Sequence, residues 1–300
     1  MLCSSLIKKT QKPCQNQARY LVHAHTPGEQ RLCGLHSHGL DRVALPKEPV
    51  DPQIYQKQQE SCDQTAEANR AIGQKGSVIL TQLRMMRSPE HQEGILSVFP
   101  NYKHGNRKDG LGLPGLSPKS LGPVYHGQPG LPPALNLENF HQFSKCYSSE
   151  LDPDGQPAKI FYETQTRGFL DPTPHRHKLA AIGLMADQHK NIPICFVWID
   201  REGNKHYLSY IESRQFYCNF YERMVLPNCD FATLQTLLDD GYHLNIIGYD
   251  AHPISDPSPA GLEREYLDPR RPFGHELVLY CLLTLTPNDY PWRKHTTFEF

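Results

Sequence analysis

The sequence lacks any long hydrophobic run. Its longest apolar stretch, residues 277–285, is much shorter than the roughly 20 residues that a membrane-spanning helix needs. The first residues, MLCSS, have neither the charged segment nor the apolar segment of a secretory signal. We therefore expect an intracellular protein, in the cytoplasm or nucleus of a host cell or in a virion, without membrane contact.

The chain also lacks a dominant charge and has few hydrophobic residues. Its 31 basic and 32 acidic residues leave a net charge of −1, so no overall field attracts nucleic acid or an anionic membrane. Hydrophobic residues make up 38%, whereas 26 prolines and 21 glycines indicate long loops. Aromatic and β-branched residues gather in the second half, where we expect one large core.

A disulfide framework is not expected either, because nine cysteines are an odd number and no export signal is present. Four ligand-type residues lie near the N-terminus instead: Cys3, Cys14, Cys33 and His36. These side chains suit tetrahedral Zn²⁺, and the Cys-x-x-His spacing lets two of them bind one ion from a single turn. The segment between the first two cysteines has too few apolar residues to fold without a cross-link. We predict a structural zinc module over residues 1–40.

This pattern resembles short Cys…Cys…Cys-x-x-His modules at the front of proteins of large DNA viruses and some phages. His23, His25 or His38 could replace one ligand, and the alternative is a disordered tail with incidental cysteines. The cations of the module fit a solvated face or a contact with nucleic acid. They are Lys8, Lys9, Lys12, Arg19 and Arg31.

Two further segments follow. Residues 41–76 are polar and broken by prolines, and we expect a linker that forms a tether or a surface helix. Residues 77–300 should form a mixed α/β domain of the α+β class, with long loops rich in proline and glycine. Strands are expected at 77–80, 95–99, 194–199, 206–211 and 244–249, and helices at 136–147, 216–224 and 231–238. The apolar residues 277–285 form either a helix that begins near Pro272 or a buried strand.

Two cationic segments are candidates for binding phosphate. Lys103 and Arg107 lie among the glycines of a long loop, residues 101–133, where backbone amides and cations could approach an anion. His175, Arg176 and Lys178 follow one another closely and suit a 5′-phosphate or pyrophosphate. A solvated surface is the alternative in both places.

The helix expected at 136–147 carries Glu138, Gln142 and Lys145. Their spacings of four and three residues place a carboxylate, an amide and an ammonium on one face. An exposed polar face with weak pair energies is the alternative.

This Glu-x-x-x-Gln-x-x-Lys helix resembles that of the NADAR family, named for its association with NAD and ADP-ribose, in which it follows a Leu-Ser motif. Leu116 and Ser117 stand in that place here. The resemblance covers roughly residues 95–290 and includes the order of the later elements. The family's tryptophan-glycine pair is represented at best by residues 266–268, and its glycine-rich segment is reduced to residues 273–276. The long loops are similar to those of divergent relatives in large DNA viruses.

The resemblance implies an N-glycosidase, which hydrolyses a ribose–nitrogen bond in ADP-ribose on a nucleobase or in a ribosylated nucleotide. An oxocarbenium-like transition state needs a carboxylate near the anomeric carbon, and Glu138 is the first candidate. Gln142 and Lys145 would keep it ionised and position a ribose hydroxyl or a phosphate. A second acid would protonate the leaving base or bind the ribose diol. The candidates, in order of preference, are Asp268, Glu276 and Asp250.

Two other functions fit the sequence. The first is a non-catalytic virion- or nucleic-acid-associated protein that keeps the fold. The second is a metal-dependent hydrolase that uses the histidines. The enzyme hypothesis predicts an ADP-ribose-like or nucleotide substrate, structural zinc, and nucleic acid contact only through the N-terminal module.

Overall fold

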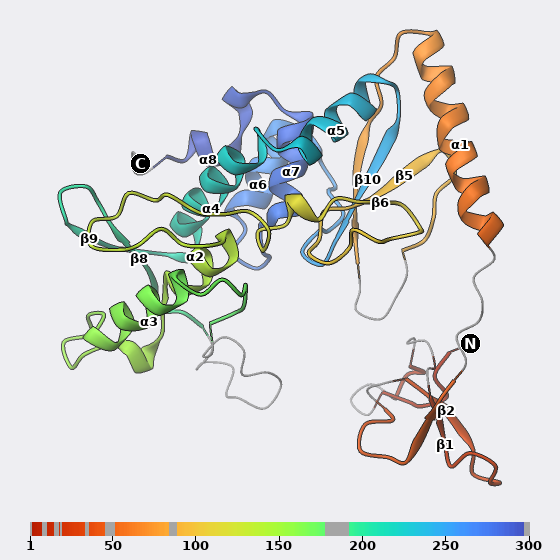
Figure 1. Cartoon of the computed structure of the whole chain (residues 1–300), viewed down its shortest axis with the longest axis horizontal. Helices are drawn as coiled ribbons and strands as arrows, with labels where there is room; N and C mark the ends of the chain where they lie inside the picture. Colours follow the sequence, from red (N-terminus) through yellow and green to blue (C-terminus); the bar gives the residue numbers. More distant parts are fainter. Residues whose placement is uncertain are drawn as a thin grey trace.

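Helices and sheets are both present, so the fold is α+β as expected (Figure 1). The computed structural model describes residues 2–7, 11–14, 18, 20–33, 36–45, 52–83, 89–177 and 192–296. Within these ranges, no helix has the length and apolar character to cross a membrane.

The N-terminal residues form a small antiparallel sheet. Strand β1 (Tyr20–Val22) lies between β2 (Gln30–Leu32) and β3 (Arg42–Ala44). The preceding chain folds back onto it, since the Ser4 N–H donates to the Arg31 carbonyl. The core of this module consists of Val22, Leu32 and three cysteines. So little apolar surface cannot hold a fold without a further cross-link.

The larger body is built on a parallel sheet with the strand order β4-β10-β5-β6. The strands are β4 (Val78–Gln82), β5 (Ile95–Phe99), β6 (Leu111–Gly112) and β10 (His243–Gly248). Strand β10 lies between β4 and β5, and its Leu244, Ile246 and Ile247 are fully buried. A central parallel strand has neighbours on both sides, which explains the largely apolar residues 244–248 that predicted it.

Helix α1 (Pro52–Ala71) packs against this sheet near β5 and β10. Cys62 and Ala66 are buried, and the Asn69 amide donates to the Gly241 carbonyl. Where a tether or surface helix was expected within residues 41–76, the helix belongs to the larger body. Its buried stripe is narrow, which is why the hydrophobic pattern did not reveal the packing.

A second, antiparallel sheet has the order β7-β8-β9 and contains the predicted hairpin. Its strands are β7 (Lys145–Cys146), β8 (Cys195–Ile199) and β9 (Lys205–Leu208). The expectation of a strand as far as residue 211 was wrong, because Ser209 caps helix α4 through a capping box with Glu212.

The helices of the larger body pack against both sheets. They are α2 (Leu137–Phe143), α3 (Lys159–Phe169), α4 (Tyr210–Val225), α5 (Cys229–Asp239), α6 (Pro259–Leu267), α7 (His275–Thr284) and α8 (Pro291–Lys294). Short 3₁₀ turns occur at Pro114–Leu116, Ser148–Glu150 and Pro287–Asp289. The apolar residues from 277 onward are therefore helical.

Helix α2 is shorter than predicted. The side chain of Asn136 caps its N-terminus, as expected, by accepting from the Asn139 N–H. The helix ends at Phe143, and Ser144 turns its hydroxyl back to the Phe140 carbonyl at 2.8 Å. Lys145 consequently begins β7, so Glu138 and Gln142 come from a helix and Lys145 comes from a strand.

Candidate functional site

A pocket of about 460 Å³ opens where β5 and β10 end, beside α2, α4 and α7. Asn101 and Tyr102 follow β5, and Tyr249 and Asp250 follow β10. The carboxyl ends of parallel strands are the usual place for ligands in open sheets with helices around them. Six residues predicted from the sequence line this pocket: Glu138, Gln142, Lys145, Arg176, Asp250 and Glu276.

Glu138, Gln142 and Lys145 form a hydrogen-bonded row along one wall. Gln142 Nε2 donates to Glu138 Oε1 at 3.2 Å, and Lys145 Nζ donates to Gln142 Oε1 at 3.2 Å. Burial lowers the pKa of Lys145 to about 8, although the negative charge of Glu138 opposes this shift. The amide thus fixes the carboxylate, and the lysine fixes the amide.

Glu276 lines the pocket from the first turn of α7 and is 1% exposed. Burial by itself would raise its pKa, but the neighbouring His275 brings the pKa below its ordinary value. Glu276 Oε2 lies 3.1 Å from His275 Nδ1, with which it forms an ion pair. A Cβ at Gly248 would lie 1.9 Å from Glu276 Oε1, so only glycine at the end of β10 leaves room for this carboxylate.

Asp250 lines the same pocket as these two carboxylates, and both of their charges act on it. Burial of its carboxyl group, followed by the charge of Glu276, raises the pKa of Asp250. His275 and Arg176 oppose this shift, and Glu138 adds to it. Carboxylates whose environments separate their pKa values are the arrangement that acid–base chemistry requires.

Aromatic and cationic side chains line the rest of the pocket. Tyr102, Tyr210 and Tyr249 are each about two-fifths or more exposed to solvent, at 38%, 40% and 49%. Lys119 and Arg176 are exposed cations that have no ion-pair partner among the described residues. Lys119 and the tyrosines were missed in the sequence because single residues from separate loops and from the first turn of α4 carry no local pattern.

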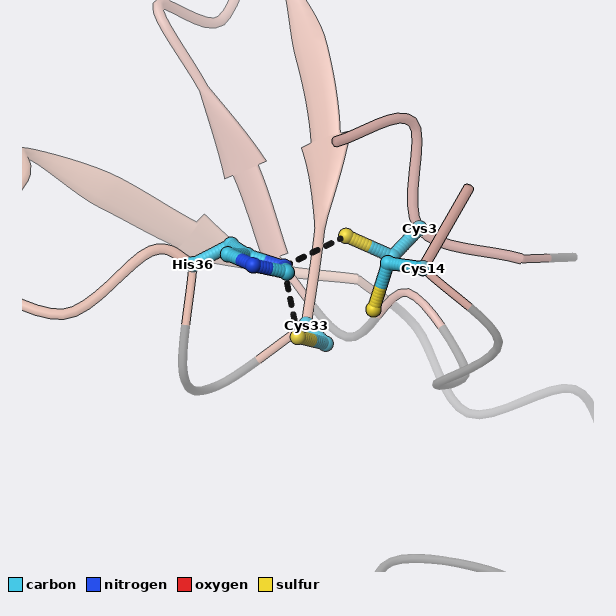
Figure 2. Close-up of side chains that lie close together, drawn as sticks. All are labelled: Cys3, Cys14, Cys33 and His36. Carbon is cyan, nitrogen blue, oxygen red and sulfur yellow. Dashed lines mark hydrogen bonds between the residues drawn. The ribbon is translucent and has the colours of Figure 1, made fainter. Parts of the chain in front are cut away.

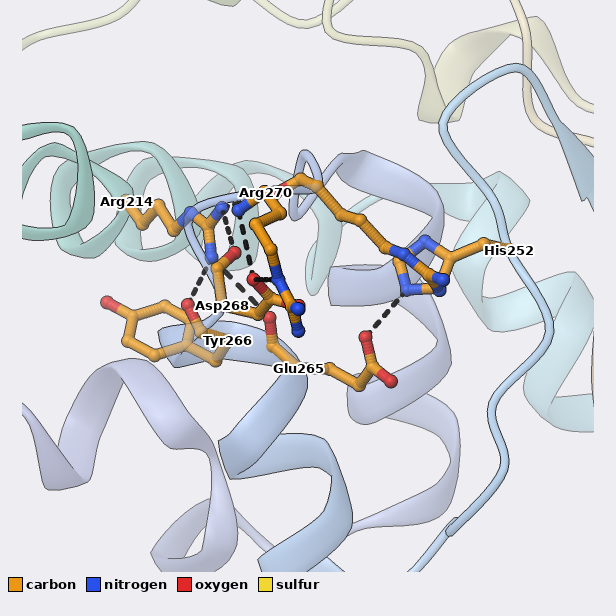
Figure 3. Close-up of polar contacts among 7 residues, drawn as sticks. Arg214, His252, Glu265, Tyr266, Asp268 and Arg270 are labelled. Carbon is orange, nitrogen blue, oxygen red and sulfur yellow. Dashed lines mark hydrogen bonds and ion pairs between the residues drawn. The ribbon is translucent and has the colours of Figure 1, made fainter.

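Asp268, the first choice for the second acid, does not line the pocket. Its carboxylate binds the Arg270 side chain and backbone N–H, which lowers its pKa. The backbone around it faces Arg214, whose buried guanidinium donates to the carbonyls of Tyr266, Asp268 and Arg271 (Figure 3). The Asp268 side chain, which is 17% exposed, thus pairs with Arg270 outside the pocket. Asp250 and Glu276 are the acids that line the pocket together with Glu138.

The expected phosphate loop lies elsewhere as well. Arg107 forms an ion pair with Asp109 and stacks over the Phe99 ring at 3.8 Å. Lys103 lies over the ring of Tyr102 and does not line the pocket. Neither cation points to a shared anion site.

The cluster at residues 174–178 divides between two pockets. Arg176 lines the pocket described above, whereas His175 and His177 line a neighbouring one. His175 Nε2 lies 3.0 Å from Asp171 Oδ2, and His177 Nε2 lies 3.3 Å from Glu150 Oε1. Lys178 lies outside the described residues. Within the described ranges, the histidines do not belong to a group of metal ligands.

The four predicted zinc ligands come together in the N-terminal module, and the cluster can hold a metal ion (Figure 2). The ligand atoms of Cys3, Cys14, Cys33 and His36 all lie within 4.8 Å of one another. His36 Nδ1 is 3.4 Å from the sulfurs of both Cys3 and Cys33. In a tetrahedral site with Zn–S of about 2.3 Å and Zn–N of about 2.05 Å, such S···N pairs are about 3.6 Å apart.

Comparison of the chain with protein-family models, curated protein sequences and solved structures finds no match.

Proposed function

We propose that the protein is an N-glycosidase that hydrolyses a ribose–nitrogen bond, and that it is a divergent member of the NADAR family. The observation that carries the proposal is the convergence of Glu138, Asp250 and Glu276 on one pocket, with Gln142 and Lys145 holding Glu138. Cleavage of a glycosidic bond needs at least two carboxyl groups with different protonation states.

The environments of the three acids suggest separate roles. Glu138 is held by an amide whose other end binds an ammonium, and it would stabilise positive charge at the anomeric carbon or orient water. Asp250, whose pKa is raised, would be the proton donor to the leaving base. Glu276 is kept ionised by its ion pair with His275, and its carboxylate would accept a hydrogen bond from a ribose hydroxyl.

The groups at the mouth suit the remaining parts of a nucleotide. Lys119 and Arg176 would bind a phosphate or pyrophosphate. Tyr102, Tyr210 and Tyr249 offer exposed rings on which a base could stack. The proposed substrate is therefore a nucleobase that carries ADP-ribose, or a ribosylated nucleotide.

The test compares the full chain with Glu138→Gln on an ADP-ribosylated oligonucleotide and on a ribosylamino-pyrimidine nucleotide. Chromatography should detect free base or ADP-ribose with the unmodified chain and none with the variant. Glu163→Gln is the matched control, since Glu163 is an exposed carboxylate on α3 whose ion pair, among the described residues, is with Lys159 at 3.5 Å. Equal product from both chains would refute the role of Glu138. Binding of ADP-ribose without turnover would favour the non-catalytic function.

We propose Zn²⁺ as the ion of the N-terminal cluster, with a structural role. Three thiolates and one imidazole leave no coordination position for substrate, which is typical of structural zinc. Arg31 and Lys12 are exposed on this module and could contact nucleic acid. The other cations named for this contact, Lys8, Lys9 and Arg19, lie outside the described residues.

A further inference from the structure

Two free cysteines face each other across the β7–β8 pair. Cys146 and Cys195 are direct register partners in this antiparallel ladder. Such partners have Cα atoms about 4.5–5.5 Å apart and side chains on the same face. A disulfide needs Cα atoms about 4.4–6.8 Å apart, so the backbone already has the required spacing.

The two thiols also contact each other in one small cluster. Cys146 packs with Phe161 and Val197, and Cys195 lies against this cluster. The Cys146 thiol donates to the Tyr147 carbonyl at 3.9 Å. The proximity of the two sulfurs lowers the pKa of Cys195 and raises that of Cys146. Cys146 is 0% exposed, whereas Cys195 is partly exposed. The accessible thiol is therefore the one with the greater thiolate character.

We propose that Cys146 and Cys195 form a reversible disulfide when the protein meets a hydroperoxide. Cys195 attacks the peroxide as a thiolate and becomes a sulfenic acid, and one water is released. The Cys146 sulfur then attacks the Cys195 sulfur, an S–S bond forms, and a second water leaves. Two thiols and one hydrogen peroxide thus give one disulfide and two waters. A dithiol reductant restores both thiols.

This bond would lie at the edge of the candidate site. Lys145 directly precedes Cys146 and donates to Gln142, which in turn holds Glu138. Strand β7 has two residues and pairs only with β8 among the described strands. A covalent link to β8 would therefore fix the backbone that carries Lys145. The proposal concerns the thiols themselves and does not depend on the glycosidase function.

The experiment maps cysteines in the full chain after brief treatment with hydrogen peroxide. Remaining thiols are alkylated, the protein is digested with trypsin without reductant, and peptides are identified by mass. We expect a linked pair of peptides 146–159 and 191–201, lighter by two hydrogens than their sum, that separates on addition of dithiothreitol. The oxidised protein should also unfold at a higher temperature than the reduced protein, because the bond closes a long loop.

Serine variants provide the controls. Cys146→Ser and Cys195→Ser should each abolish the linked pair, whereas Cys229→Ser should leave it unchanged, because Cys229 is exposed and distant in sequence from both. The proposal fails if Cys146 and Cys195 both stay reduced, and are therefore alkylated, at a peroxide concentration that oxidises Cys229. It also fails if Cys195 is converted to sulfinic or sulfonic acid while Cys146 stays free. If a serine variant does not fold, the map of the unmodified chain decides the question alone.

Discussion

Glu276 Oε2 lies 3.1 Å from His275 Nδ1, and the two side chains are 1% and 11% exposed. His275 Nε2 reaches the Pro100 carbonyl at 3.1 Å, so the ring joins α7 to the end of β5. Burial alone would lower the pKa of His275, but Glu276 raises it above 6.5. The neighbours correspondingly bring the pKa of Glu276 below 4.5. A buried ion pair thus forms one wall of the pocket.

The first prediction is a pH-dependent stability that originates in this pair. Because the pKa of His275 is raised in the folded protein, this histidine contributes to the free energy of unfolding. Its contribution is fully present below pH 6.5 and is lost as the pH rises through the folded pKa. Because the pKa of Glu276 is lowered, its contribution to the free energy of unfolding is present above pH 4.5 and is lost as the pH falls through the folded pKa. The contribution of the pair should therefore be greatest between these two values.

Urea unfolding from about pH 6 to about pH 9 should show a falling free energy of unfolding. His275→Gln should remove this slope and destabilise the protein by about 3–5 kcal/mol, because Glu276 stays buried without a partner. The exposed His38 serves as control, and His38→Gln should keep both the slope and the stability. The same slope in His275→Gln would assign the effect to another group.

The second prediction concerns the metal of the N-terminal module. The purified chain should contain about one zinc ion, and Cys33→Ser should lose it, because three ligands hold zinc far more weakly than four. Elemental analysis measures the metal, and limited proteolysis reports unfolding before residue 45. Cys229→Ser should retain the ion. Under the proposed function, chelation should leave the chemistry of the pocket in place, whereas loss of activity on chelation would favour the metal-dependent hydrolase.

The third prediction concerns Arg214, which is 4% exposed and donates to carbonyls between Glu265 and Arg271. Lysine cannot reproduce a planar group that bonds several carbonyls. Arg214→Lys should therefore lower the free energy of unfolding by about 2–4 kcal/mol in urea titrations. Arg223→Lys, on the exposed side of the same helix, should change it by less than about 0.5 kcal/mol. Equal effects of the two substitutions would show that the carbonyl contacts contribute little.

The features that could be predicted depend on residues that lie close together in the sequence. Asn136 caps α2, and Glu138 and Gln142 follow on one face, as the helical repeat requires. The buried run of β10 and the pair Cys33 and His36 are likewise local patterns. Each of these features can be read within about ten residues, because the backbone geometry of a turn, helix or strand sets them.

The features that were missed depend on contacts between distant residues. In the sequence, Asp250 follows the strand expected at 244–249, and Asp268 precedes the apolar residues 277–285, so neither position shows which carboxylate reaches the pocket. Arg214 binds the backbone around Asp268 from more than 50 residues away. Asp250 instead follows the central parallel strand and is carried to the pocket by strand order. Only tertiary structure distinguishes the two carboxylates.

The fourth prediction follows from this difference and tests the proposed acid. Asp250→Asn keeps the size of the side chain but cannot donate an acidic proton, so kcat on the glycosidase substrate should fall about 10²–10⁴-fold. Asp268→Asn alters a surface pair with Arg270, whose side chain is 85% exposed, and should leave kcat within about twofold. Substrates with better leaving groups need less protonation, so they should partly rescue Asp250→Asn and leave Glu138→Gln inactive. If Asp250→Asn is fully active while Glu276→Gln is not, the proton donor is Glu276, and the raised pKa of Asp250 has no catalytic role.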